Sequence, residues 1–142
     1  MTTQNSVEPA IELLLILTAH TTAVRTVTGT PLGDRTIVDI VSGTFEGPQL
    51  SGRVPATGGD WLIRTSRGSR MNVRLLLETH DGASILFQYF GRASLIDSKL
   101  RIEVAGTFDA PEGPYGWLND IQTFGFGTMI PDGVRYNFYR FK

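Results

Sequence analysis

The chain has 142 residues, of which 41% are hydrophobic and 19% are charged, and its formal net charge is −1. These values are typical of a single globular domain and exclude a disordered chain. Basic and acidic residues are interspersed, so no basic stripe is present to follow a phosphate backbone, and we expect no nucleic-acid partner.

The first eight residues are polar, and we expect them to form a flexible N-terminus before a single domain over residues 9–142. The apolar run Ile11–Ala19 that follows is too short to span a bilayer. Glu8 and Glu12 stand where a secretory signal would carry Lys or Arg. We therefore interpret the run as a buried strand and expect no membrane association.

Glycine and proline divide the chain into short runs rich in apolar and β-branched residues, as is typical of strands separated by turns. The chain contains 16 Gly and 7 Pro, and no window favours a long amphipathic helix. In chain order, the predicted strands are Pro9–His20, Ala23–Gly29, Arg35–Phe45, Gln49–Val54, Trp61–Thr65, Ser69–Thr79, Ala83–Ala93, Lys99–Phe108, Tyr115–Phe124 and Val134–Phe141. A helical turn is tolerated only in the residues after Arg92, through Asp97.

Alternation and turn chemistry support these strands. Met71, Val73, Leu75 and Leu77 share one face, which is the period-two pattern of a half-buried strand. The dipeptides at residues 67–68, 81–82 and 132–133 each end in glycine and favour tight hairpin turns. Eight to ten such strands predict an all-β, antiparallel barrel, whose interior at about eight strands is either filled or holds one small ligand.

Several spaced motifs from residue 33 onward resemble one known family. They are Gly33–Arg35, Gly43–Pro48, Gly52, Gly58–Trp61, Leu77–Ala83, Tyr115–Asn119 and Val134–Phe141. In this order they resemble the DUF3237 family, also catalogued as UPF0311, which implies a barrel of the lipocalin or allene-oxide-cyclase kind. Some members are associated with natural-product or aromatic metabolism, and the resemblance supplies no established catalytic set. Two departures are a short connection after Gly91, where members often carry an insertion, and Arg67-Gly68 in place of the usual Asp-Gly.

Asp60 is the first candidate for chemistry, because it follows two glycines and precedes Trp61. A carboxyl desolvated beside apolar groups has a raised pKa and serves as general acid or base. Alternatively, Asp60 accepts hydrogen bonds from backbone amides at a strand start, which would lower its pKa. Glu46 is the second candidate, with a solvated turn carboxylate or an ion pair as its alternative. The two would divide acid and base roles if they faced one cavity.

The substrate-binding candidates are aromatic, amide and guanidinium groups. Tyr115, Trp117 and Asn119 fall on one face of a predicted strand and would form a platform for a flat ligand, or else simply fill the barrel core. The remaining candidates are Trp61 and Tyr89 as cavity walls, and Arg64 and Arg74 as ligands for a carboxylate or phenolate. On the outer face, each arginine would be only a solubilising charge.

No metal or cofactor is expected. The two histidines are far apart, and His80 lies in a predicted turn, so no zinc site is predicted. The chain has no cysteine, which excludes thiolate metal sites and a cysteine nucleophile and fits a cytoplasmic location. Neither a nucleophile elbow nor a nucleotide-binding glycine loop is present.

The sequence thus predicts a cofactor-independent enzyme, a cyclase, isomerase or lyase, that uses acid–base chemistry on a small hydrophobic or aromatic molecule inside the barrel. The alternatives are a carrier barrel that binds without chemistry and a structural subunit with a filled interior. Edge strands that need covering are compatible with a homo-oligomer.

Overall fold

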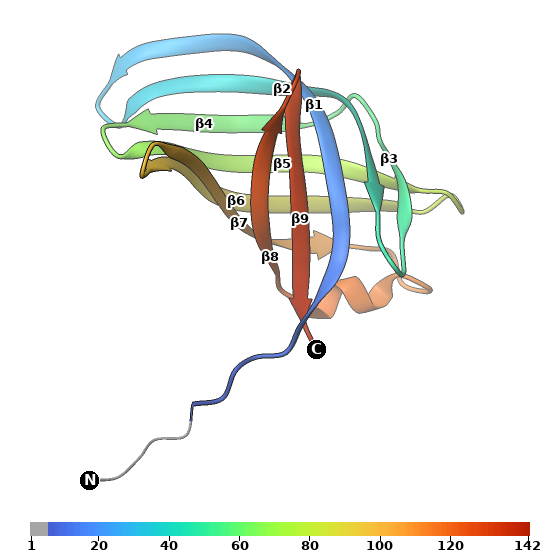
Figure 1. Cartoon of the computed structure of the whole chain (residues 1–142). Coiled ribbons are helices and arrows are strands. Elements are labelled where there is room, and N and C mark those ends of the chain that lie inside the picture. Colours follow the sequence, from blue (N-terminus) through green and yellow to red (C-terminus); the bar gives the residue numbers. More distant parts are fainter. Residues whose placement is uncertain (1–5) are drawn as a thin grey trace, which may run out of the picture.

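In the computed structural model, which describes residues 6–142, the chain forms nine strands and one short 3-10 helix (Figure 1). The elements are β1 (Ile11–Thr30), β2 (Gly33–Glu46), β3 (Ser51–Val54), β4 (Gly59–Thr65), β5 (Gly68–Thr79), β6 (Ser84–Ile96), β7 (Lys99–Asp109), η1 (Gly116–Asp120), β8 (Thr123–Ile130) and β9 (Gly133–Phe141). All strand pairs are antiparallel.

The strands close into a barrel with eight positions around its wall. The hydrogen-bonded order runs β1-β9-β8-β7-β6-β5, and β2 pairs with β1 to complete the ring. One position, between β2 and β5, is shared by two strands in succession: β3 fills it near Glu46, and β4 fills it near Asp34. The predicted antiparallel barrel is therefore confirmed.

Alternation along each strand decides which side chains face inward. On β5 the predicted face of Met71, Val73, Leu75 and Leu77 is buried, while Arg74 is exposed on the opposite face. Tight turns join the strands as expected: Gly82 adopts a φ of 91° and Gly68 a φ of 119°, values that favour glycine. Period-two patterning therefore gives the orientation of most inward residues.

One end of the barrel is filled by side chains, and we call it the closed end. The ring of Phe87 stacks on that of Phe108 with centroids 4.2 Å apart, and the ring of Phe138 meets Phe87 edge-on at 4.9 Å. Leu118 of η1 is fully buried and belongs to the same hydrophobic core as these rings. The opposite end, which we call the mouth, is bounded by the turns β1–β2, β4–β5, β6–β7 and β8–β9.

Three element predictions were wrong. The two strands predicted between Pro9 and Gly29 form the single strand β1, whose register shifts at His20/Thr21 and again after Ala23. The helical turn tolerated after Arg92, through Asp97, is absent: β6 continues to Ile96 in register with β7, and Asp97 and Ser98, which both adopt positive φ (51° and 65°), make the two-residue turn between the strands.

The third wrong element is the strand predicted over Tyr115–Phe124. Its first part is η1, and the strand β8 begins only at Thr123. Two prolines and Gly113, with a φ of 122°, turn the chain away from the barrel wall before this point.

The N-terminal expectations are tested only in part. Residues 1–5 of the predicted flexible segment lie outside the described residues, while residues 6–10 are exposed and precede β1. Figure 1 shows this part of the chain leading away from the barrel near the C-terminus. Within residues 6–142, no helix is long and apolar enough to cross a membrane.

Candidate functional site

The mouth half of the barrel encloses a cavity of about 330 Å³. This volume is at the lower end of the range for small-molecule sites, which are typically about 300–1,000 Å³. Most of the wall is apolar. The lining residues are Ala19, Thr21, Val38, Ile40, Asp60, Leu62, Arg64, Ser69, Met71, Val73, Tyr89, Ala93, Leu100, Ile102, Met129, Val134 and Tyr136.

The start of β4 places Asp60 in the cavity wall. Gly58 has a φ of 81°, and a Cβ there would collide with the carbonyl oxygen of Arg74, so a glycine is needed where the chain re-enters the barrel wall. Two residues later Asp60 lies between Val38 of β2 and Val73 of β5 in the ladder. The carboxyl group of Asp60 faces the cavity from this position.

Two opposing effects act on the Asp60 carboxyl group. Burial in the apolar wall raises its pKa, whereas a hydrogen bond of 3.0 Å donated by the Asn72 backbone amide to Oδ1 lowers it. Burial is the larger effect, and the pKa rises from 3.8 to about 6. The desolvation and the backbone hydrogen bond that the sequence analysis gave as alternatives are therefore both present, and desolvation has the larger effect on the pKa. A carboxyl with this pKa exchanges protons readily near neutral pH.

Two tyrosines form the floor of the cavity beside Asp60. The rings of Tyr89 and Tyr136 meet edge-on with centroids 5.2 Å apart, and these residues are 1% and 3% exposed. Burial raises the pKa of both hydroxyl groups. Tyr136 and then the negative charge of Asp60 raise the pKa of Tyr89 further, whereas the charge of Asp60 raises that of Tyr136 and the Tyr89 hydroxyl lowers it by a smaller amount. The Tyr136 hydroxyl lies 3.9 Å from Met71 Sδ. Both phenols therefore stay protonated and can donate hydrogen bonds to a bound molecule.

Glycines on the inner faces of β7 and β8 make room for this floor. A Cβ atom on Gly106 would lie 2.7 Å from Tyr89 Cβ, and one on Gly127 would lie 2.8 Å from Tyr136 Cε1. A larger residue at Gly127 would displace the Tyr136 ring, and one at Gly106 would collide with the Gln88 carbonyl oxygen and with Tyr89 Cβ. The glycine pattern of the sequence thus reflects the space that the aromatic floor occupies.

Arg64 lies on the same face of β4 as Asp60, four residues closer to the mouth, and lines the rim of the cavity. At the rise of a β-strand, four residues correspond to about 13 Å. Arg64, Asp60 and Tyr89 are therefore the candidate residues that line this cavity, together with Tyr136, which the sequence analysis did not single out. Alternation from Phe138 would have placed Tyr136 on the inner face of β9.

Two other candidates face outward: the expectation that Trp61 lines the cavity was wrong, whereas Arg74 has the outer-face position that was its alternative. Trp61 is 56% exposed, because inward placement of Asp60 forces its neighbour onto the outer face. Arg74 is likewise outward, between the inward Val73 and Leu75. Trp61 and Arg74 instead share a groove on the outer surface of the barrel.

Glu46 does not share a cavity with Asp60. It ends β2 at the closed end of the barrel, next to the inward and fully buried Phe45, and its own side chain is exposed on the outer face. Asp60 lies further toward the mouth, opposite Val38 of the same strand. The suggested division of acid and base roles between Glu46 and Asp60 was therefore wrong.

Tyr115, Trp117 and Asn119 lie at the closed end rather than in the cavity, so the predicted ligand platform was wrong. The Asn119 side chain bonds the backbone of Ala110 at both its amide (2.8 Å) and its carbonyl (2.9 Å). The Arg140 guanidinium lies 5.2 Å above the Trp117 ring. These contacts hold η1 against the barrel, which matches the alternative that the aromatics fill the core.

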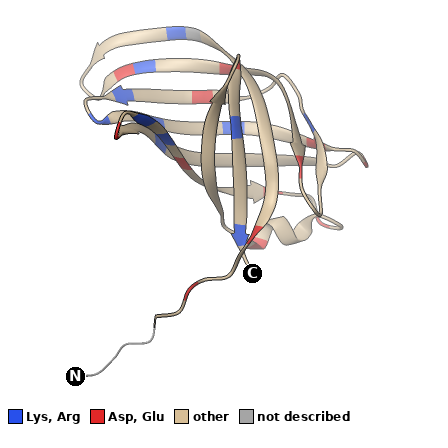
Figure 2. Cartoon of the chain, in the orientation of Figure 1, with Lys and Arg blue, Asp and Glu red and all other residues tan. Residues whose placement is uncertain are grey.

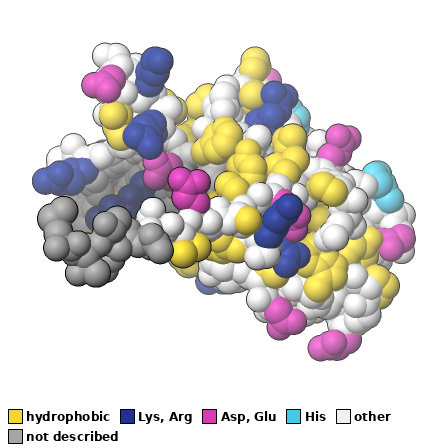
Figure 3. All heavy atoms as spheres, turned by 60° about the horizontal axis from the view of Figure 1, so that its bottom comes forward, with side chains coloured by type: hydrophobic (Ala, Val, Ile, Leu, Met, Phe, Trp, Pro, Cys, Tyr) yellow, Lys and Arg dark blue, Asp and Glu magenta, His cyan; other side chains and the backbone are white. Residues whose placement is uncertain are grey.

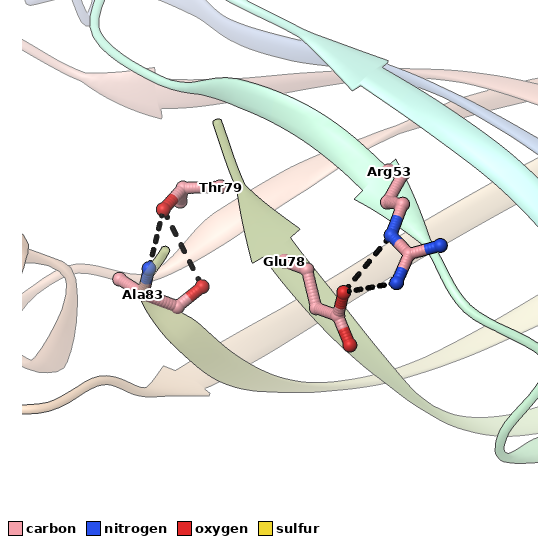
Figure 4. A network of polar contacts seen from close by, with 4 residues as sticks. All are labelled: Arg53, Glu78, Thr79 and Ala83. Atoms are coloured by element: carbon pink, nitrogen blue, oxygen red, sulfur yellow. Dashed lines mark hydrogen bonds and ion pairs between the residues drawn. The ribbon is translucent and has the colours of Figure 1, made fainter. Parts of the chain in front are cut away.

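The β5–β6 turn is held at the same end by polar contacts (Figure 4). The Ala83 amide donates to Thr79 Oγ1 at 2.8 Å, and Arg53 of β3 forms an ion pair of 2.8 Å with Glu78. Hydrogen bonds from the Thr79 and Tyr115 hydroxyls hold the pKa of Asp81 below its usual range. The adjacent His80 is exposed in this turn. Within residues 6–142, no group of three or more His, Asp or Glu side chains is placed to hold a metal ion.

Comparisons with known proteins agree with this architecture. A family model described as "Protein of unknown function (DUF3237)" matches residues 6–141. No match was found among the curated proteins.

Solved structures extend the comparison. A β-barrel-like protein from Acinetobacter baumannii AYE is 28% identical, with a TM-score of 0.81 over 97% of this chain and 100% of its own. A protein of unknown function from Rhodopseudomonas palustris is 19% identical, with a TM-score of 0.88 over 96% of this chain and 100% of its own. An enzyme from Penicillium herquei is 20% identical, with a TM-score of 0.80 over 99% of this chain and 100% of its own. At 19% and 20% identity, the latter two show a shared fold alone.

Proposed function

Because the chain belongs to the DUF3237 family, whose function is described as unknown, we propose its function from the site itself: a cofactor-independent enzyme that moves a proton on a small hydrophobic or aromatic molecule held in the barrel. One observation carries this proposal. The Asp60 carboxyl, with a pKa of about 6, faces an apolar cavity beside two protonated phenols.

Asp60 supplies the acid–base step. Near neutral pH its carboxylate accepts a proton from an acidic C–H or O–H group of the bound molecule, and the resulting carboxylic acid returns that proton to another atom. The net change is an isomerisation or a ring closure, which needs no co-reactant. Addition or loss of water would proceed through the same carboxyl group.

Tyr89 and Tyr136 stabilise the charge that develops during this transfer. A hydroxyl aimed at an oxygen that becomes negative stabilises the transition state more than the ground state. The apolar wall strengthens this interaction because it excludes water. The Penicillium herquei protein is described as an enzyme, so this fold is compatible with catalysis.

Proton exchange tests the proposal without knowledge of the natural substrate. We expect the protein to accelerate exchange of the acidic C–H hydrogens of 2-tetralone in D₂O, measured by ¹H NMR. Asp60→Asn is expected to lower this catalysed rate by about 100-fold or more, since general bases typically contribute 10²–10⁴-fold. Because the carboxylate is the base, the rate should rise with pH up to about pH 6 and then level off.

Glu46→Gln is the matched control, because it makes the same carboxyl-to-amide change on the outer face of the barrel. Its exchange rate should equal that of the unaltered protein. If 2-tetralone binds in the barrel but no exchange is accelerated, the carrier function is correct instead. Equal loss of rate in both variants would remove Asp60 from the mechanism.

A further inference from the structure

The two charged residues that line the cavity differ in sign and depth. Asp60 lies beside the floor, and Arg64 lies at the rim. The wall between them is formed mainly by aliphatic side chains such as Leu62 of β4. A bound molecule therefore meets a carboxyl group at its inner end and a guanidinium group at its outer end.

The guanidinium group of Arg64 has no carboxylate partner among residues 6–142. The ion pairs of the described part of the chain involve Arg53, Arg101 and Arg140. Asp34 is the cross-strand neighbour of Arg64 on β2, but its carboxylate accepts a hydrogen bond of 2.9 Å from the backbone amide of Gly29. Among residues 6–142, no ion pair therefore competes with an anionic ligand for the Arg64 guanidinium group.

The charges of the whole molecule favour approach of an anion to the mouth. Figure 2 shows basic positions concentrated at the strand ends around the mouth, in the left part of the view. Figure 3, turned toward the lower side of the barrel, shows acidic side chains on the right, the side of the β5–β6 turn. The mouth half carries Arg25, Arg35, Arg64, Arg67, Arg70, Arg92, Lys99, Arg101 and Arg135 against Asp34, Asp39, Asp60, Asp97, Glu103 and Asp132, whereas the closed end carries Glu12, Glu46, Glu78, Asp81, Asp109, Glu112 and Asp120 against Arg53, Arg140 and Lys142.

An uneven distribution of this kind steers a charged molecule by the local potential rather than by the net charge. A guanidinium group also binds carboxylate in a planar, two-point arrangement. Asp60 and Arg64 are about 13 Å apart along β4, which leaves room for an apolar body between the two groups.

We propose that the molecule bound in the barrel is an amphipathic anion, whose apolar body fills the cavity and whose carboxylate or phenolate is held by Arg64 at the mouth. This inference rests on the proposed function for the choice of cavity and adds the charge and the orientation of the ligand. The uncharged end of the molecule then lies at Asp60, where the proton transfer takes place.

Two matched probes test the charge requirement. The affinities of the full chain for 4-phenylbutyrate and for its uncharged amide, 4-phenylbutyramide, are compared by titration at pH 7 and low salt. Labelling methionine methyl groups with ¹³C reports on the cavity directly, because Met71 and Met129 both line it. We expect the carboxylate to bind at least tenfold more tightly than the amide and to shift both methyl signals.

Two variants locate the anchoring charge. Arg64→Gln should weaken binding of the carboxylate by about tenfold and leave binding of the amide unchanged. Arg67→Gln removes a nearby positive charge in the β4–β5 turn that does not line the cavity, and should preserve the difference between the probes.

Each other outcome overturns part of the proposal. Equal affinity of both probes for the unaltered protein refutes anion recognition, yet leaves the barrel as a binding site and the proposed function standing. Equal losses from Arg64→Gln and Arg67→Gln refute Arg64 as the anchor and assign the effect to general surface charge. Failure of both probes to shift either methionine signal refutes the ligand assignment, and the exchange assay with 2-tetralone then decides the proposed function independently.

Discussion

At the scale of single residues, the neighbours Asp60 and Trp61 have the reverse of the usual inward and outward placement. Binary patterning places polar residues outside and aromatic residues inside, yet here Asp60 faces the cavity and Trp61 faces solvent. Such a reversal raises the free energy of the folded state, and residues that break the pattern in this way are often functional. The orientation of the Asp60-Trp61 pair is therefore an argument for function as well as a geometric fact.

This arrangement predicts a dependence of stability on pH. The folded-state pKa of Asp60 is raised from 3.8 to about 6, so the folded chain holds the proton more tightly than the unfolded chain does. The free energy of unfolding should therefore fall as pH rises from about 4 to 6. At higher pH, Asp60 should cause no further decrease. The difference between the pKa values corresponds to a loss of about 3 kcal/mol.

Asp60→Asn should abolish this loss while keeping an oxygen to accept the Asn72 amide. Urea unfolding at pH 4.5 and pH 7.5 is the measurement. The variant should be more stable than the unaltered protein at pH 7.5, with a smaller difference at pH 4.5. A variant that is less stable at both pH values would show that burial is not the larger effect on this carboxyl group.

At the scale of secondary-structure elements, regular alternation made most of the strands predictable. The strand β5 was predicted nearly to its ends, and its inward face was identified from four apolar residues. The conformation of the segment from Tyr115 to Asn119 was not predicted correctly, because three alternating residues over five positions fit a 3-10 helix as well as a strand. The position of η1 depends on contacts with distant residues, such as Asn119 with Ala110, which local pattern does not encode.

The same limit applies to the candidate site. Pattern alone identified Asp60 and Arg64 as neighbours on one face of β4 and left open whether this face was inner or outer. Only closure of the barrel brings β9 to the other side of the cavity and places Tyr136 beside Tyr89. Pairs that meet across a barrel are separated by long stretches of chain, so no sequence window contains both.

Because η1 lies at the closed end, we expect a substitution in it to change stability without changing ligand binding. Leu118→Ala removes a fully buried side chain at the closed end and should lower the free energy of unfolding by about 2–5 kcal/mol. Affinity for 4-phenylbutyrate should be unchanged, because the cavity lies at the other end. Leu95→Ala, at a residue that is 74% exposed, is the control and should change stability by less than about 0.5 kcal/mol. Loss of affinity in folded Leu118→Ala protein would contradict the separation of the two ends.

At the scale of the whole molecule, the two ends of the barrel differ in strand pairing. Residues 16–20 of β1 pair with both β2 and β9, and the pairing with β9 ends at His20. Beyond His20, β1 pairs with β2 alone, apart from one hydrogen bond of 2.9 Å that the Thr21 amide donates to the Asp132 carbonyl. Strands held on one side have fewer backbone hydrogen bonds and open more easily.

Hydrogen exchange measures this difference. Amides of residues 22–30 should exchange faster than those of residues 16–19, which pair with a strand on both sides. Mass spectrometry after proteolysis would resolve the two segments. Equal protection would mean that the distal part of β1 is covered in solution, for example by a second copy of the chain.

The separation of charge between the two ends has a practical result for anyone who purifies this protein. A formal charge of −1 suggests weak retention on any ion-exchange column. With arginines around one pole and carboxylates around the other, the molecule presents a different pole to sulfonate beads than to quaternary-ammonium beads. It should therefore adsorb to both resins at neutral pH and low salt, each time in a defined orientation.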